Sequence, residues 1–172
     1  SMNNKQPNAQ AIYDELLSQV RRAASPSPLL LVGIHTGGAW IAQRLAADLA
    51  ESGPELGFLS SAFHRDDIAQ RGLPSSMKST QLPLSIDDRE IILVDDILFT
   101  GRTVRAALNE LFDYGRPRSV KLAVLVDRGG RQLPFQPDFC GSRIELGAGE
   151  NLRLSQDTAG RFDLAIVREE QA

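Results

Sequence analysis

The sequence predicts a doubly wound α/β fold built on a mostly parallel sheet. Continuously apolar segments alternate along the chain with segments whose apolar residues repeat at helical spacing. Strands that are apolar throughout are typical of a sheet with helices on both faces. The tail differs, because Asn151 to Val167 has the pattern of an antiparallel hairpin that turns at Thr158-Ala159-Gly160.

The individual elements follow from these two patterns. Continuous apolar runs predict strands at residues 29–32, 91–94 and 122–126, and residues 56–63 are expected to form a further strand. Helical spacing predicts helices that begin after Asn8, after Gly38 and after Thr103. Proline and glycine mark their ends: residues 25–28 and 52–54 stop the first two, and Gly115 is the expected C-cap of the third.

The segment from His64 to Leu82 is polar and rich in turn residues, and it predicts a lid hairpin, because a loop of this length in a compact domain is usually functional. Arg65, near its start, would bind an anionic leaving group when the lid closes. A solvated charge cluster at the start of an exposed hairpin accounts for Arg65 equally well.

The stretch from Ile91 to Thr103, IILVDDILFTGRT, holds the main chemical signal. Asp95 and Asp96 follow the apolar strand and are expected at its carboxyl end, where open α/β sheets form ligand crevices. The turn that follows offers backbone amides, two hydroxyls and a helix N-terminus to an anion. Carboxylates for hydroxyl groups beside a cradle for phosphate together indicate a site for a phosphorylated sugar.

This combination resembles the ribose-5-phosphate site of the type I phosphoribosyltransferases. The resemblance implies that Thr100, Gly101, Arg102 and Thr103 bind the 5′-phosphate of phosphoribosyl pyrophosphate. It assigns pyrophosphate to the backbone of Thr36, Gly37 and Gly38, in the glycine-containing turn after the first strand. Asp95 and Asp96 would act in catalysis together with Arg65, and Mg²⁺ would be held at the same two acids.

Phe99 bears on which nucleobase is the substrate, because purine-type members of the superfamily commonly carry an aspartate at that position. An apolar ring cannot act as an acid or a base, so Phe99 favours a pyrimidine, read through backbone contacts near Val126, Asp127 and Arg128. The motifs VGIHTGG, FHRDD, VDDILFTGRTVRAAL and LAVLVDRGG resemble the PyrR family of pyrimidine-operon regulators that are also uracil phosphoribosyltransferases. The substrates implied are phosphoribosyl pyrophosphate and uracil, and the products are UMP and pyrophosphate.

The chain also departs from the PyrR pattern. Gly37 stands where the family usually has arginine, and Gly130 stands where it usually has histidine on the RNA-binding surface. Ile144-Glu145-Leu146-Gly147 replaces a usual Ile-Pro-Thr-Ser run. Binding of a pyr leader RNA, which would use Arg128 and Arg131, is therefore in doubt, whereas the phosphoribosyl motifs are complete. Any such binding would need a local basic strip, formed by Arg116, Arg118, Lys121, Arg128 and Arg131.

Composition limits the remaining possibilities. The length of 172 residues fits one phosphoribosyltransferase domain, residues 1–172, and the net charge of −3 gives no general attraction for nucleic acid or membrane. A single cysteine, Cys140, and the lack of an apolar run near ~20 residues favour a cytoplasmic protein without a membrane partner. We also expect a homo-oligomer, whose size the sequence does not specify.

Two other functions compete with uracil phosphoribosyl transfer. The first is a non-catalytic regulator that senses UMP in the same pocket, and the glycine at position 37 favours it. The second is a phosphoribosyltransferase for another base, which Phe99 argues against for purines. An assay of UMP formation separates the first from an enzyme, and a panel of bases separates the second.

Overall fold

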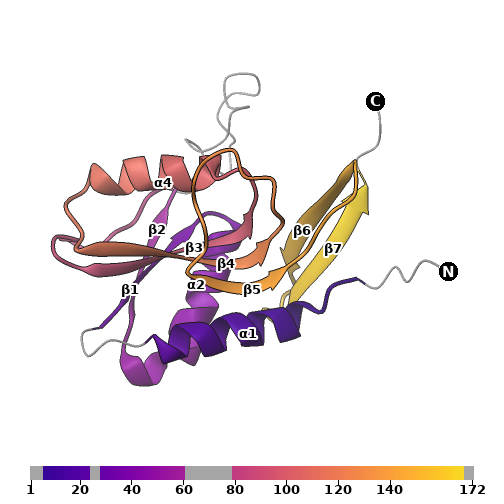
Figure 1. Cartoon of the computed structure of the whole chain (residues 1–172). Coiled ribbons are helices and arrows are strands. Elements are labelled where there is room, and N and C mark those ends of the chain that lie inside the picture. Colours follow the sequence, from indigo (N-terminus) through magenta and orange to yellow (C-terminus); the bar gives the residue numbers. More distant parts are fainter. Residues whose placement is uncertain (1–5, 24–27, 61–78, 169–172) are drawn as a thin grey trace.

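The computed structural model describes residues 6–23, 28–60 and 79–168. Its centre is a five-stranded parallel sheet in the order β2-β1-β3-β4-β5, and a two-stranded antiparallel sheet stands beside it (Figure 1). The predicted parallel sheet and the predicted C-terminal hairpin are confirmed. The strands are β1 (Leu30–Ile34), β2 (Glu55–Leu59), β3 (Glu90–Leu98), β4 (Ser119–Asp127), β5 (Phe139–Arg143), β6 (Glu150–Gln156) and β7 (Phe162–Arg168).

Helices cover both faces of the parallel sheet, with α1 and α2 on one side and α4 on the other (Figure 1). The helices are α1 (Ala9–Arg22), α2 (Gly37–Asp48) and α4 (Arg102–Phe112), and a 3-10 turn, η1 (Ala50–Ser52), follows α2. Asn8 caps α1, because its side-chain oxygen accepts a hydrogen bond from the Ala11 amide at 3.0 Å. Each helix buries its apolar stripe against the sheet, which explains why all five residues of β1 are buried.

Strand β3 is longer than predicted, and this changes the setting of the acidic pair. It continues through Leu98, so Asp95 and Asp96 lie inside the strand and not beyond its end. The reason is that β4 extends equally far and pairs with it, Ile97 opposite Val126 and Leu98 opposite Asp127. The expectation that the strand stops before the acids is therefore wrong.

Strand β5 was not predicted, because its sequence, FCGSR, has no continuous apolar run. Two contacts with α1 hold it. The Gln19 side chain donates to the carbonyl oxygen of Cys140 and accepts from its amide, both at 2.9 Å. Gly141 lets the helix approach, since a Cβ atom there would lie 2.6 Å from the carbonyl oxygens of Ile12 and Leu125.

The C-terminal hairpin of β6 and β7 turns where predicted, with Gly160 at a φ of +84°. Leu154, Phe162 and other inward residues of the hairpin join the core beside α1. Arg44 of α2 secures the turn, because its guanidinium donates to the carbonyl oxygen of Gly160 at 3.1 Å and lies over the rings of Tyr13 and Phe162.

Gly115 does not cap α4, contrary to the prediction. The helix ends at Phe112 with Asp113 as its cap, and Gly115 has no positive φ. The glycine is needed for close packing, since a Cβ atom there would lie 2.7 Å from the carboxylate of Asp87 and 2.9 Å from Ile86.

Most of the predicted lid, including Arg65, lies outside the described residues. At its far side, Gln81 pairs with Phe58 of β2 through an antiparallel bridge.

Candidate active site

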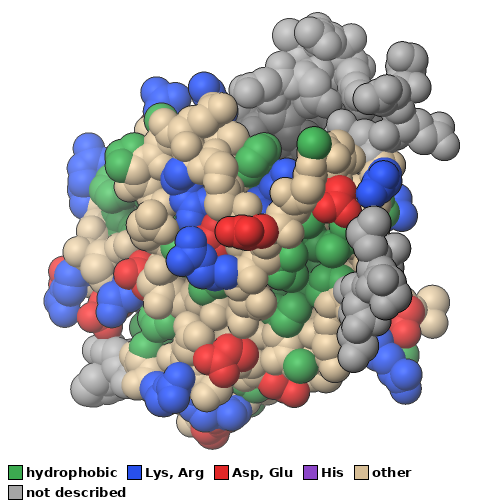
Figure 2. All heavy atoms as spheres, turned by 45° about the vertical axis from the view of Figure 1, so that its right-hand side comes forward, with side chains coloured by type: hydrophobic (Ala, Val, Ile, Leu, Met, Phe, Trp, Pro, Cys, Tyr) green, Lys and Arg blue, Asp and Glu red, His purple; other side chains and the backbone are tan. Residues whose placement is uncertain are grey.

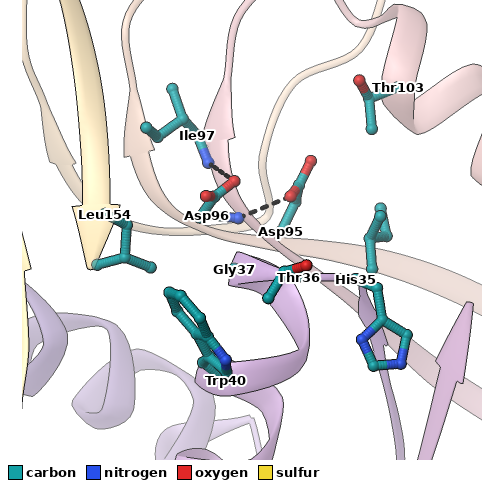
Figure 3. Close-up of a pocket in the computed structure, with 10 residues that line it drawn as sticks. His35, Thr36, Gly37, Trp40, Asp95, Asp96, Ile97, Thr103 and Leu154 are labelled. Carbon is teal, nitrogen blue, oxygen red and sulfur yellow. Dashed lines mark hydrogen bonds between the residues drawn. The ribbon is translucent and has the colours of Figure 1, made fainter. Parts of the chain in front are cut away.

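A cleft of about 310 Å³ opens at the carboxyl ends of β1 and β3 (Figure 3). Parallel sheets place their ligand crevices at this edge, because the chain turns there from strands into helix N-termini. The lining residues come from β1, the first turns of α2 and α4, β3 and β6: Ile34, His35, Thr36, Gly37, Trp40, Asp95, Asp96, Ile97, Thr103 and Leu154.

Asp95 and Asp96 form the acidic floor of this cleft. Asp95 is 7% exposed and its side chain accepts the amide of Asp96, while Asp96 accepts the amide of Ile97, both at 2.8 Å. These local bonds accompany an irregularity in the strand, because Val94 and Ile97 pack on the α1 side whereas Leu98 packs on the α4 side. Consecutive residues can therefore both present carboxylates to the cleft (Figure 3).

Burial raises the pKa of Asp95 well above its ordinary value, and the negative charge of Asp96 raises it further. A cation or several hydroxyl donors at this point would lower the cost of keeping both groups ionised. The described residues contain no group of three or more His, Cys, Asp or Glu side chains arranged for a metal. A metal bound here would therefore share its coordination with oxygen atoms of a ligand.

The first turn of α2 is pressed against the acidic pair, and two glycines make this possible. A Cβ atom at Gly37 would collide with the carboxylate of Asp96, and one at Gly38 would collide with the carbonyl oxygen of Val94. Thr36 and Gly37 line the cleft, whereas Gly38 is buried beneath it. The free amides at this helix N-terminus are suited to an anion.

The second predicted anion-binding element is the turn into α4. Gly101 has a φ of +94° and precedes the helix, which begins at Arg102. The Thr100 hydroxyl accepts the amide of Arg102 at 3.1 Å, and Arg102 donates from Nε to Gln132 at 2.9 Å. Of this predicted phosphate loop, Thr103 reaches the cleft itself (Figure 3).

The predicted base-binding residues gather at the neighbouring strand ends. The guanidinium of Arg128 lies over the ring of Phe99, 3.9 Å from its centre. Val126 is completely buried, so its side chain belongs to the core. Asp127 is buried too and pairs with Arg131 at 2.6 Å. Burial alone would raise the pKa of Asp127, but hydrogen bonds from Arg131 and the Gly129 amide hold it below its ordinary value.

The five basic residues predicted as one strip do not form one. Arg116 and Arg118 precede β4, and Lys121 lies near its start, whereas Arg128 and Arg131 follow its end. Most of β4 lies between the two groups, and a strand extends by roughly 3.3 Å per residue. On the face shown in Figure 2, basic and acidic side chains are interspersed, without a large area of one sign.

Comparison with known proteins agrees with this arrangement. A family model described as a phosphoribosyl transferase domain matches residues 3–145. A protein of Ralstonia nicotianae named bifunctional protein PyrR is 51% identical over 162 residues, which is 92% of each chain. One of the same name from Nitrosococcus oceani is 45% identical over 174 residues, covering 96% of this chain and 98% of the relative.

The chain belongs to the PyrR family of phosphoribosyltransferases. Among solved structures, hypoxanthine phosphoribosyltransferase of Trypanosoma cruzi matches with a TM-score of 0.67 at 23% identity, over 95% of this chain and 91% of that one. The corresponding Staphylococcus aureus enzyme matches with a TM-score of 0.58 at 20% identity, over 80% and 75%. These likenesses show the shared fold.

Five of the ten residues that line the cleft were not among the predicted site residues: Ile34, His35, Trp40, Ile97 and Leu154. Trp40 could have been found, because helical spacing places it one turn beyond Thr36, whose carbonyl oxygen accepts its amide at 3.2 Å. Leu154 could not, since only tertiary packing brings β6 to this edge. The ring of His35 points away from the acids (Figure 3). It packs against the ring of Phe58, with 5.2 Å between the two ring centres.

Proposed function

We propose that this protein transfers the phosphoribosyl group of phosphoribosyl pyrophosphate to uracil, giving UMP and pyrophosphate, and that it regulates pyrimidine biosynthesis. One observation carries the proposal: an acidic pair, of which Asp95 is buried and Asp96 half-buried, shares a cleft with the N-terminal turns of two helices. Acceptors for ribose hydroxyls and two anion-binding turns match a substrate with a phosphate at each end of a sugar.

In the proposed complex each part of the substrate has a place. The ribose hydroxyls donate to Asp95 and Asp96, and the 5′-phosphate rests on the turn from Thr100 to Thr103. Pyrophosphate rests on the first turn of α2, where Thr36 and Gly37 line the cleft. Arg65, in the lid, would close on the pyrophosphate; it lies outside the described residues.

The reaction breaks the bond between C1′ and the pyrophosphate oxygen, and the electron pair leaves with pyrophosphate. N1 of uracil forms the new bond to C1′ and loses its proton. The ribose ring gains positive charge in the transition state, as in glycoside cleavage, and the two acids would stabilise that charge. Mg²⁺ held by Asp95 and Asp96 would neutralise the departing pyrophosphate.

The regulatory half of the proposal is that UMP, bound in the same cleft, changes the affinity for leader RNA. The name of the relatives, which describes a bifunctional protein, supports it. An anisotropy titration with a pyrimidine-operon leader RNA, with and without UMP, tests this half separately.

The enzymatic half is tested by incubating the whole protein with labelled uracil, phosphoribosyl pyrophosphate and Mg²⁺, and measuring labelled UMP. We expect UMP to form in an Mg²⁺-dependent reaction. Binding of UMP without turnover would instead establish the non-catalytic sensor.

A further inference from the structure

One arginine connects three chain segments beside the cleft. Arg128, directly after β4, places its guanidinium over the ring of Phe99, which follows β3. The same guanidinium donates from Nη1 to the side-chain oxygen of Asn151 at 2.9 Å, and from Nη2 to the carbonyl oxygen of Glu150 at 3.5 Å. Both acceptors begin β6, whose Leu154 lines the cleft. The hairpin is therefore tied to the end of the main sheet by a side chain.

The ring of Phe99 is held from other directions as well. Gly130 has a φ of +76°, and a Cβ atom there would collide with the ring. Arg131 donates from Nη1 to the carbonyl oxygen of Phe99 at 2.8 Å. The ring nevertheless remains 44% exposed, so part of it is available to a ligand.

We infer that Arg128 is a positioning residue for the nucleobase, holding Phe99 and the start of β6 as one wall of the base subsite. This inference rests on the proposed function and deepens it. Arginine is required because a planar guanidinium can stack on a ring and donate hydrogen bonds in its own plane at the same time, which a lysine ammonium cannot do. Among the described residues the Nε–H of Arg128 has no acceptor, so the stack and Asn151 set its orientation.

This role differs from the RNA contact expected from the basic residues. A phosphate that used Arg128 would have to draw its guanidinium away from Phe99 and Asn151 together. Arg153, on the same strand as Asn151, is exposed and provides a matched control for charge on this hairpin.

The test compares Arg128→Lys and Asn151→Ala with the control Arg153→Lys in the full chain. For Arg128→Lys, which keeps the charge, we expect the KM for uracil to rise about tenfold, the scale of losing the guanidinium stack and its charge-assisted hydrogen bond. Asn151→Ala should give a smaller rise, because the stack remains. The KM for phosphoribosyl pyrophosphate and kcat should change less than about threefold, because the ribose and phosphate contacts are separate from this wall.

Tryptophan fluorescence gives a second readout. Trp40 is the only tryptophan and lines the cleft with Leu154, so loosening of β6 in Arg128→Lys should shift its emission to the red. Equal rises in both KM values, or no rise for uracil, would overturn the inference. A reduced salt dependence of RNA binding in Arg128→Gln, which removes the charge, together with an unchanged KM for uracil in Arg128→Lys, would overturn it in favour of a phosphate contact.

Failure of the proposed function would be recognised separately, as a wild-type protein that makes no UMP. In that case equilibrium titrations followed by Trp40 fluorescence test the wall directly. Arg128→Lys should then weaken UMP binding about tenfold, as expected for loss of one stacked, hydrogen-bonded guanidinium. The binding of phosphoribosyl pyrophosphate should stay within about threefold of the wild-type value. Equal effects on the two ligands would contradict the inference.

Discussion

Asp95 and Asp96 are adjacent in a strand that is otherwise mostly apolar, and Asp95 keeps only 7% of its surface exposed. Burial and the neighbouring charge both raise the pKa of Asp95. Keeping Asp95 ionised therefore lowers the stability of the folded protein. A protein retains such a destabilising charge only where function requires it. The acidic pair is thus a site where stability and function oppose each other.

Asp95→Asn should make the free protein more stable while it removes phosphoribosyl transfer. Because the pKa of Asp95 is raised in the folded state, wild-type stability should increase as pH falls through that raised value toward the ordinary 3.8, and the variant should lack this gain. Each kcal/mol recovered at neutral pH should raise Tm by about 2–4 °C. Thermal unfolding against pH measures this, with exposed Asp163→Asn as control; a lower Tm for Asp95→Asn would contradict the account.

Arg131→Ala should destabilise the fold strongly, because it leaves the carboxylate of Asp127 buried without its partner. The side chains of Arg131 and Asp127 are 16% and 2% exposed, and breaking such a pair costs about 3–5 kcal/mol. The comparison is Arg118→Ala, which breaks an exposed pair with Asp88 and should cost much less, because solvent screens that pair. Urea unfolding at pH 7 measures both, and equal losses would refute the prediction.

The same pair has a pH signature. Since the pKa of Asp127 is lowered in the folded state, its stabilisation is complete above the ordinary value of 3.8 and is lost as pH falls through the lowered one. Wild-type stability should therefore contain a loss below about pH 4 that Arg131→Ala lacks. Urea unfolding repeated at acidic pH would detect it.

At the scale of elements, the sequence predicts well what depends on local pattern. The apolar runs locate β1 to β4, and helical spacing locates the helices that cover them. What it misses depends on partners distant in the chain. Strand β5 exists because β4 and Gln19 supply its hydrogen bonds, and β3 passes through Asp95 and Asp96 because β4 continues beside it.

The site divides in the same way. The acids, the glycine turn and the start of α4 could be predicted, because carboxylates, paired glycines and threonine hydroxyls can be recognised in the sequence itself. The inward orientation of Arg131 could not, because it depends on Asp127 and on carbonyl oxygens that the fold brings to it.

Gly38→Ala should disturb the active site through the packing of α2 on β3. Its Cβ atom would collide with the carbonyl oxygen of Val94, so the helix must move away from the acids. We expect a loss of more than about 1 kcal/mol in stability and a large rise in the KM for phosphoribosyl pyrophosphate. Gly53→Ala is the control: nothing lies within 4 Å of its Cβ position, and only its φ of +60° is unfavourable. Normal steady-state kinetics in Gly38→Ala would contradict this packing argument.

At the scale of the whole molecule, the fold does not by itself determine which base is used. The solved structures that share the fold include hypoxanthine phosphoribosyltransferases at 20–23% identity, whereas two relatives at 45% and 51% identity are named PyrR. The solved structures show the shared fold, and we predict that the residues at the ends of β3 and β4 select the base. No helix among the described residues has the length and apolar character needed to cross a membrane.

We therefore expect base choice to depend on Phe99 and its neighbours. Because Phe99 supplies no carboxylate to assist a purine nitrogen, uracil should be converted and hypoxanthine and guanine should not. A panel of labelled bases with phosphoribosyl pyrophosphate measures this. Comparable turnover of a purine would refute the assignment to pyrimidines.

The most direct test of the central claim is UMP formation by the double variant Asp95→Asn with Asp96→Asn. The account predicts that transfer is abolished while the circular dichroism spectrum and cooperative unfolding remain those of a folded protein, because neither side chain contributes apolar packing to the core. A folded double variant that makes UMP at near wild-type rate would show that these acids do not hold the ribose.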